Sequence, residues 1–242
     1  RLKREQKDNA LKTRQMLLEQ ELQRSKMASI KSQMNPHFFF NALNTIQSFI
    51  YTNEKSLAVS YLNQFSELTR MILDMSNLDL ISLMDEIKAL RLYLDLETQR
   101  FEEKLQYEIW IDPELQPDFF LLPPMLVQPY VENAIKHGLL HSKLPWQLSI
   151  AFRKTINGLE VAVEDNGIGR KKSGQLNANR QKHHQSFAMK ANEKRLEILN
   201  KGLDNDISVE IIDKENEWGA ASGTRVILRV PGNLKRGMAE SN

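Results

Sequence analysis

A single histidine, His37, lies in a short run whose residue types could carry out chemistry on a helix, Asn35-Pro36-His37-Phe38-Phe39-Phe40-Asn41. A neutral imidazole has an unperturbed pKa of about 6.5, so one ring nitrogen can act as a nucleophile at neutral pH. A lone histidine among apolar residues also suits a satisfied core or capping position. Asn41 follows about one helical turn later, where its amide could bond a transferred group or a water.

A second group of residues has the composition of a nucleotide site. The run Glu164-Asp165-Asn166-Gly167-Ile168-Gly169 follows an apolar segment that is predicted to be a strand. Gly167 and Gly169 permit a tight turn and a close approach of the backbone to a ligand. Asp165 could accept a hydrogen bond from an exocyclic amine such as that of adenine. The same pattern also occurs in ordinary turns after strands, so both interpretations stay open at this point.

A third run, Gln128-Pro129-Tyr130-Val131-Glu132-Asn133-Ala134-Ile135-Lys136-His137-Gly138, supports the nucleotide interpretation. Asn133 and Lys136 are one helical turn apart and could offer a neutral oxygen to Mg²⁺ and a cation to phosphate. His137 is a further candidate for nucleotide contact, although a cation near a helix C-terminus is also favoured on structural grounds. Gly223-Thr224 opens the last predicted strand and could supply close backbone contact to phosphates.

Residues 170–190 separate these segments and are strongly basic. They contain six cations and no acid. Such a segment suits either a solvated loop or a mobile lid that neutralises polyphosphate and orders when nucleotide binds.

The composition excludes several other classes of protein. The chain of 242 residues is 41% hydrophobic and 26% charged, as soluble globular proteins are. A net charge of +2 gives no argument for direct contact with nucleic acid, and the lack of cysteine excludes disulfides and thiolate metal sites. No apolar run approaches the roughly 20 residues that span a bilayer. Because the chain begins at Arg1, we expect it to be a fragment whose upstream part is missing.

Helices are predicted on both sides of His37. Residues 1–34 lack glycine and proline, and their apolar residues recur at helical spacing, which predicts a long helix in a coiled coil. This segment has nine cations against four acids, which suits either a solvated helix face or a segment just inside a membrane. Pro36 removes a backbone donor and is expected to kink the helix, which then continues through Ile50.

A second helix is predicted for residues 54–75, after a turn at Thr52-Asn53. Two helices joined by a short turn make an antiparallel hairpin. A lone hairpin leaves its apolar stripe half covered, and dimerisation into a four-helix bundle would close it. The residues predicted on that stripe of the second helix are Leu57, Tyr61, Leu62, Phe65, Leu68, Ile72 and Met75.

The rest of the chain mixes helix and strand patterns. Ser82 with Asp85 resembles a capping box that opens a helix to about Phe101, and further helices are predicted for residues 125–140 and 188–201. Strands are predicted at residues 105–111, 147–153, 159–164, 207–212 and 224–230, with Asn157-Gly158 as a hairpin turn. The order predicts an α+β fold with antiparallel pairing. The predicted domains are residues 1–80 and 81–235, followed by a tail at 236–242.

Taken in order, the runs Asn35–Asn41, Gln128–Gly138 and Asp165–Gly169 resemble the LytS-like (autolysin-sensor) sensor histidine kinases. The resemblance covers about residues 20–232. It implies a dimerisation and phosphoacceptor hairpin, which forms a four-helix bundle in the dimer. It also implies a following ATP-binding domain, a two-layer α/β sandwich of the gyrase/Hsp90/histidine-kinase/MutL type.

The resemblance also assigns roles to residues. His37 would be the phosphoacceptor and Asn133 the Mg²⁺ ligand, Asp165 would contact adenine, and Gly167 and Gly169 would shape its loop. The expected cofactors are ATP and Mg²⁺. The implied activity is that of a protein-histidine kinase in a two-component system, which passes the phosphoryl group to an aspartate of a response regulator.

The implied partners are a second copy of the chain and the response regulator, and the implied location is the cytoplasmic part of an inner-membrane protein. One departure from the family pattern is Ala188-Met189-Lys190-Ala191, which replaces a Gly-Leu-x-Asn pattern. Phe38 follows His37, as is usual for this family, whereas many histidine kinases of other families carry an acid there. Glu132 is therefore the candidate general base on motif position. The alternatives are a nucleotide-binding but weakly catalytic signal-transmitting dimer, and an ATP-driven clamp.

Overall fold

The computed structural model describes residues 36–170, 172–174, 194, 196–197, 199–200, 206–232 and 234. The predicted coiled-coil helix, most of the predicted helix at 188–201 and the tail at 236–242 lie outside these residues. The chain divides into two compact units, Arg1–Asn77 and Leu78–Asn242. The domain boundaries at 80 and 235 stay a prediction. Within the described part of the chain, no helix has both the length and the apolar character needed to cross a membrane.

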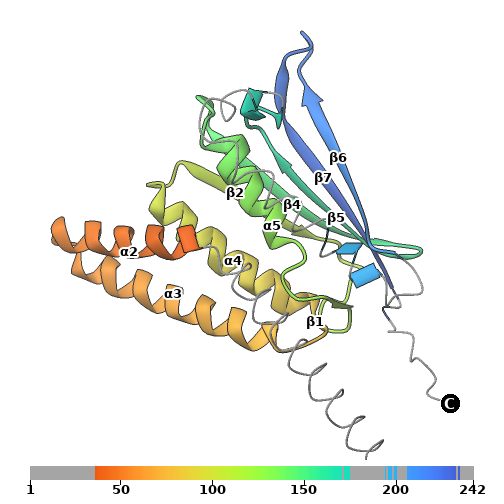
Figure 1. Ribbon diagram of the computed structural model, residues 1–242, viewed down its shortest axis with the longest axis horizontal. Helices are drawn as coiled ribbons and strands as arrows, with labels where there is room; N and C mark the ends of the chain where they lie inside the picture. Colours follow the sequence, from red (N-terminus) through yellow and green to blue (C-terminus); the bar gives the residue numbers. More distant parts are fainter. Residues whose placement is uncertain are drawn as a thin grey trace, which may run out of the picture. The chain divides into compact units, whose positions relative to one another are not determined.

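The first unit is a helical hairpin, as predicted (Figure 1). Helix α2 covers Pro36–Tyr51 and helix α3 covers Lys55–Ser76. Asn53 has a φ of 61° in the turn, a conformation that asparagine tolerates better than most residues. The rings of Phe39 and Phe65 pack edge to face at 5.1 Å, and Phe49 packs against Tyr61 at 5.9 Å. These aromatic contacts join the two helices.

Two residues of the predicted stripe of α3 are not buried within the single hairpin. Leu57 and Leu62 are exposed, whereas Ala58 is buried. The buried stripe follows the 3.6-residue period and is narrower than the run of apolar side chains. Further apolar side chains of the hairpin are also exposed, namely Phe40, Leu43, Ile50, Tyr51, Val59 and Leu73.

The second unit begins with helix α4, Leu83–Arg100. The Ser82 hydroxyl accepts a hydrogen bond from the Asp85 N–H at 3.1 Å and donates one to the Asp85 carboxylate at 2.7 Å. The predicted N-terminal cap of this helix is therefore confirmed. The helix ends at Arg100 with Phe101 as its C-terminal cap, and the two residues after the cap, Glu102 and Glu103, have positive φ.

A five-stranded sheet forms the second layer, in the order β2-β4-β5-β7-β6. Its strands are β2 Leu105–Ile111, β4 Trp146–Thr155, β5 Gly158–Asp165, β6 Ser208–Glu215 and β7 Ala221–Pro231. A separate two-stranded sheet pairs β1 Ile81–Ser82 with β3 Leu121–Leu122. The prediction of antiparallel pairing is wrong for β2 and β4, which are parallel. The chain between them contains helices and crosses over, so it returns to the sheet in the same direction.

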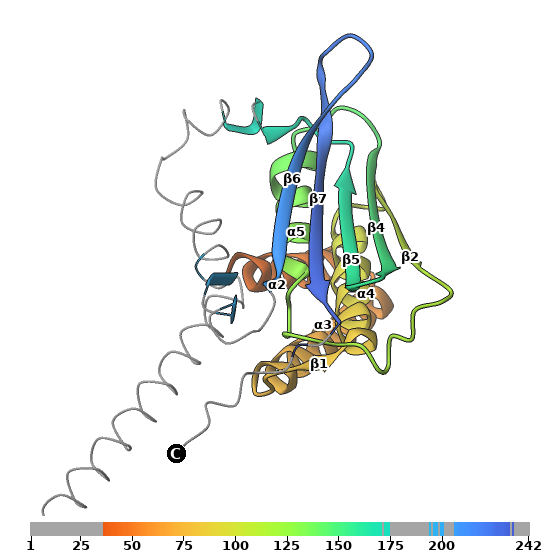
Figure 2. The ribbon, with the colours of Figure 1, turned by 90° about the vertical axis from the view of Figure 1, so that its right-hand side faces the viewer.

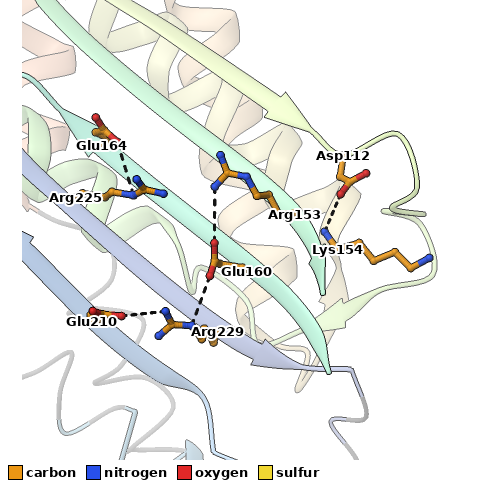
Figure 3. Close-up of polar contacts among 8 residues, drawn as sticks. All are labelled: Asp112, Arg153, Lys154, Glu160, Glu164, Glu210, Arg225 and Arg229. Atoms are coloured by element: carbon orange, nitrogen blue, oxygen red, sulfur yellow. Dashed lines mark hydrogen bonds and ion pairs between the residues drawn. The ribbon is translucent and has the colours of Figure 1, made fainter. Parts of the chain in front are cut away.

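Helices α4 and α5 cover one face of the sheet (Figure 1, Figure 2). Side chains on that inner face are apolar, such as Phe152, Val161 and Leu228. The outer face instead carries ion pairs between neighbouring strands (Figure 3). Arg229 lies 3.0 Å from Glu210 and 3.5 Å from Glu160 on that face. The predicted α+β class, with a two-layer sandwich after a helical hairpin, is confirmed.

The helix predicted at residues 125–140 is shorter and of two types. Helix α5 covers Gln128–Asn133, and a single π-helical segment, η1, continues it over Ala134–Leu139. Residues 125–127 stay outside the helix, and Met125 has a φ of 53°. Single π turns within helices are frequently found at functional sites.

Candidate functional site

A cavity of about 300 Å³ opens between α5 with η1 and the end of the inner sheet face where β5 stops. Polar groups from three segments reach it: Asn133 and His137 from the helical segment, Asp165 from β5 and Thr224 from β7. Apolar side chains supply much of the remaining wall, among them Val163, Leu196, Val209, Ile211 and Val226, and Arg170 also lines the cavity. Such a cavity, mostly apolar with a few polar groups, suits a flat organic ligand.

Asp165 is the most deeply buried acid of this cavity, with 4% of its surface exposed. The Gly167 N–H donates to its Oδ1 at 2.8 Å. Burial raises the pKa of Asp165 to about 6, and hydrogen bonds from the Gly167 and Thr224 backbones and the nearby Lys214 cation oppose that rise. The carboxylate is therefore mostly ionised at neutral pH. It can accept a hydrogen bond from a ligand donor such as an exocyclic amine.

Three glycines allow backbones to meet behind this carboxylate. A Cβ on Gly167 would lie 2.2 Å from the carbonyl carbon of Gly138, and one on Gly138 would lie 2.6 Å from Asp165 Oδ1. Gly223 has a φ of 130°, and its Cβ would lie 2.0 Å from the Asp165 carbonyl oxygen. Only glycine fits these positions. Gly138 ends one of the sequence motifs but was not predicted to be a site residue, although a glycine inside a helical segment was a signal.

The two loop glycines play different parts. Gly167 packs behind the cavity, whereas Gly169 lines it with a φ of 74°. Gly169 also approaches β7, since its Cβ would lie 3.0 Å from that of Ala221. The loop after β5 is thus fixed between η1 and the β6–β7 hairpin.

Glu132 and Lys136 are oriented differently from their neighbours. The Lys136 ammonium lies 3.0 Å from Glu132 Oε2, and the Gln128 side chain donates to Glu132 Oε1 at 3.3 Å. Neither residue is among those that line the cavity, whereas Asn133 and His137 both do. Burial, with the Lys136 and His141 charges, lowers the pKa of His137. His137 is therefore a neutral hydrogen-bonding group at neutral pH.

Two buried acids of α4, Glu86 and Glu97, support this region, and neither was predicted from the sequence. Glu86 accepts hydrogen bonds from the backbone N–H groups of Met125 and Val127 at 2.7 and 2.9 Å, which fixes the segment before α5. Glu97 pairs with Arg100 at 2.5 Å, yet burial outweighs this attraction and raises its pKa to about 7. No local pattern signals the role of Glu86, because its partners lie about 40 residues away.

His37 and Asn41 belong to the first unit, which contains the helical hairpin. The backbone of His37 lies in the first turn of α2, and Asn41 follows four residues later on the same helix. The Asn41 carbonyl accepts a hydrogen bond from the Thr45 hydroxyl at 3.0 Å. Among the described residues, no group of three or more histidines and acids could hold a metal ion.

Comparisons with known proteins agree with the resemblance. Residues 25–105 match the histidine kinase family. The chain is 34% identical over 151 residues to sensor protein LytS of Oceanobacillus iheyensis, covering 61% of this chain and 25% of that protein. It is 37% identical over 147 residues to sensor histidine kinase BtsS of Escherichia coli K12, covering 60% of this chain and 25% of BtsS.

A Bacillus subtilis protein called YwpD is 36% identical over 149 residues, covering 60% of this chain and 52% of YwpD. The catalytic domain of histidine kinase ThkA aligns at 10% identity with a TM-score of 0.44, over 64% of this chain and 97% of that domain, a weak likeness. The chain spans about half the length of YwpD and about a quarter of LytS and BtsS. The predicted resemblance to the LytS-like sensor histidine kinases is confirmed.

Proposed function

We propose that this chain is the kinase core of a sensor histidine kinase, which transfers the γ-phosphoryl group of ATP to His37 and then to an aspartate of a response regulator. The observation that carries the proposal is the buried Asp165 carboxylate, which faces a cavity with apolar walls. An adenine ring would satisfy both features, since its exocyclic amine donates a hydrogen bond and its faces are apolar.

The phosphoryl transfer needs few groups from the protein. A lone pair of the His37 imidazole forms the P–N bond while the bond from the γ-phosphorus to the bridging oxygen breaks, and ADP leaves with that electron pair. The imidazole proton is then lost, and Glu132 is the proposed acceptor. In the second step the regulator carboxylate attacks the same phosphorus and His37 leaves. Positioning and charge neutralisation supply most of the catalysis in such reactions.

Asn133 fits the proposed role of Mg²⁺ ligand. Its side chain lines the cavity, and Mg²⁺ commonly takes few protein ligands because nucleotide phosphates and waters complete its shell. When bound, the ion would neutralise charge on the phosphates. We also propose that Lys136, His137, Gly223 and Thr224 contact the nucleotide. Lys136 would have to exchange its partner Glu132 for a phosphate group.

The proposed partners follow from the hairpin. Its exposed apolar side chains suit a second copy of the chain, because a four-helix bundle would bury them. A response regulator would be the second partner, and no direct contact with nucleic acid is proposed. We propose that the chain works as the cytoplasmic part of an inner-membrane protein.

Incubation with labelled ATP and Mg²⁺ tests the proposal. We expect label that is lost in acid and stable in base, as phosphohistidine is, and no such label in His37→Gln. Acid-labile label that persists in His37→Gln would overturn the assignment. ATP binding without phosphohistidine, even with a cognate regulator present, would instead favour a weakly catalytic signalling dimer. That alternative is motivated by Ala188 and Ala191, which lie outside the described residues.

Mixing two defective chains tests whether the phosphoryl group is transferred within one protomer or from one protomer to the other. A heterodimer of Asn133→Ala with His37→Gln can be labelled only if one protomer phosphorylates the other.

A further inference from the structure

One ion pair stands at the cavity itself. Arg170 lines the cavity directly after Gly169, and its Nε and Nη2 lie 2.7 and 2.9 Å from the two carboxylate oxygens of Asp213. Such a two-point arrangement holds the guanidinium plane in one orientation. The two residues come from segments 43 positions apart in the sequence, so the pair joins the loop after β5 to strand β6.

Asp213 belongs to the row of β6 that faces the cavity. Side chains alternate along a strand, and Val209 and Ile211 of the same row line the cavity wall. Arg170 therefore reaches across from the loop to continue the wall that these two side chains begin. The backbone that carries Arg170 is also held in place, because the preceding residue, Gly169, packs closely against Ala221.

The basic character of residues 170–190 suggested contact with polyphosphate, but the geometry of Arg170 favours another role. Two of its nitrogens are already bonded to Asp213, and the adjacent carboxylate cancels its charge. A phosphate would have to displace Asp213. The flat face of the guanidinium remains, and arginine faces stack well on aromatic rings.

We propose that Arg170 forms a wall of the nucleobase site and contacts the base, and that Asp213 is the positioning residue that holds it there. This inference rests on the proposed nucleotide-binding function and specifies it further. It assigns Arg170 to the base end of the ligand and not to the phosphates.

Affinities of the whole chain for adenosine and for ATP test the assignment, because adenosine carries the base without phosphates. In Arg170→Gln we expect both affinities to fall by the same factor, about tenfold. Asp213→Asn keeps the arginine but holds its guanidinium less firmly, and should lower the affinities for both ligands about threefold. Asp213→Glu keeps a two-oxygen acceptor and should restore most of the affinity.

The outer face offers a matched control. Arg229 and Glu210 join β7 and β6 at 3.0 Å with similar exposure, but they lie away from the cavity. Arg229→Gln and Glu210→Gln should leave both affinities unchanged, which separates a contact with the base from a general loosening of β6. Thermal unfolding of each variant shows whether it is folded, and Asp213→Asn provides the test if Arg170→Gln does not fold.

Two results would overturn the inference. A loss confined to ATP would assign Arg170 to the phosphates, and unchanged affinities for both ligands in folded variants would make the pair purely structural. Failure of the unmodified chain to bind either ligand is a different result, since it would overturn the proposed function itself and this inference with it.

Discussion

Glu164 and Asp165 are neighbours on β5, yet the two faces of the sheet give them opposite surroundings. Glu164 lies on the outer face, 3.8 Å from Arg225 (Figure 3). Its carboxylate also lies 2.6 Å from the Lys214 ammonium. Asp165 lies on the inner face, buried, where backbone N–H groups bond its carboxylate. Solvated ion pairs contribute little to stability, whereas a buried carboxylate is costly to ionise. A costly group of this kind, facing a cavity, is typical of a binding site.

The largest expected difference between the two acids is in nucleotide affinity. Asp165→Asn replaces an ionised acceptor with an amide that also presents donors, so we expect ATP affinity to fall about 100-fold. Glu164→Gln should change it less than about twofold, since its carboxylate is solvated and faces away. Calorimetric titration of both variants measures this contrast. Equal losses would show that the inner face has no special role.

The next largest effect is expected on stability, where the backbone packs behind the Asp165 carboxylate. Gly167→Ala places a methyl group against the Gly138 backbone, which must move, so we expect about 2 kcal/mol lower free energy of unfolding. Gly174→Ala is the matched control, because nothing lies within 4 Å of a Cβ there. Chemical denaturation of the two variants compares them. A tolerated Gly167→Ala would contradict the close backbone contact.

The pH dependence should separate stability from binding. The pKa of Asp165 is raised to about 6, so its stabilising contribution is fully present below pH 4 and is lost as pH rises through 6. Nucleotide binding needs the ionised form and should weaken about tenfold from pH 7 to pH 5. Adenosine titrations across this range measure the effect. The profile should be the same in Glu164→Gln, and an unchanged affinity at pH 5 would contradict the account.

Glu97 is a second acid whose pKa is raised by burial, so its effect on stability changes with pH in the same direction as that of Asp165. Its pKa is raised to about 7, so its stabilising contribution is lost as pH rises from 5 through 7. In Glu97→Gln the free energy of unfolding should vary less with pH over this interval, by about 1 kcal/mol or more. Urea denaturation at several pH values tests this. If the free energy of unfolding varied with pH equally in Glu97→Gln and in the unmodified chain, other groups would be responsible for the pH dependence.

The smallest effect is expected on the outer face. Arg229 is half exposed and pairs with Glu210 and Glu160. Arg229→Gln should lower the free energy of unfolding by no more than about 0.5 kcal/mol, and high salt should reduce even that. A loss above 1 kcal/mol would show that the ion pairs in Figure 3 act as a structural network.

Local patterns in the sequence predicted much of this site. Asn133, His137, Asp165, Gly169 and Thr224 were all proposed from motifs, and all of them line the cavity. Each lies within or beside a motif whose chemistry is visible over a few residues. The capped helix α4 was predictable for the same reason, since its cap involves only Ser82 and Asp85.

Features that depend on distant parts of the chain were not predictable. The partners of Glu86 and Arg170 lie about 40 residues away, and no spacing rule connects them. The parallel pairing of β2 with β4 depends on the path of the chain between them. The exposure of Leu57 and Leu62 depends on where the buried stripe of α3 is centred, which tertiary packing decides.

The central claim is that a nucleotide bound beside Asp165 supplies the phosphoryl group that His37 accepts. Mass spectrometry under conditions that preserve phosphohistidine tests it most directly, after incubation of the unmodified chain, Asp165→Asn and Glu164→Gln with ATP and Mg²⁺. The account predicts phosphate on His37 in the unmodified chain and in Glu164→Gln, and a much lower level in Asp165→Asn. Phosphate on another residue, or on His37 of Asp165→Asn at an undiminished level, would contradict it.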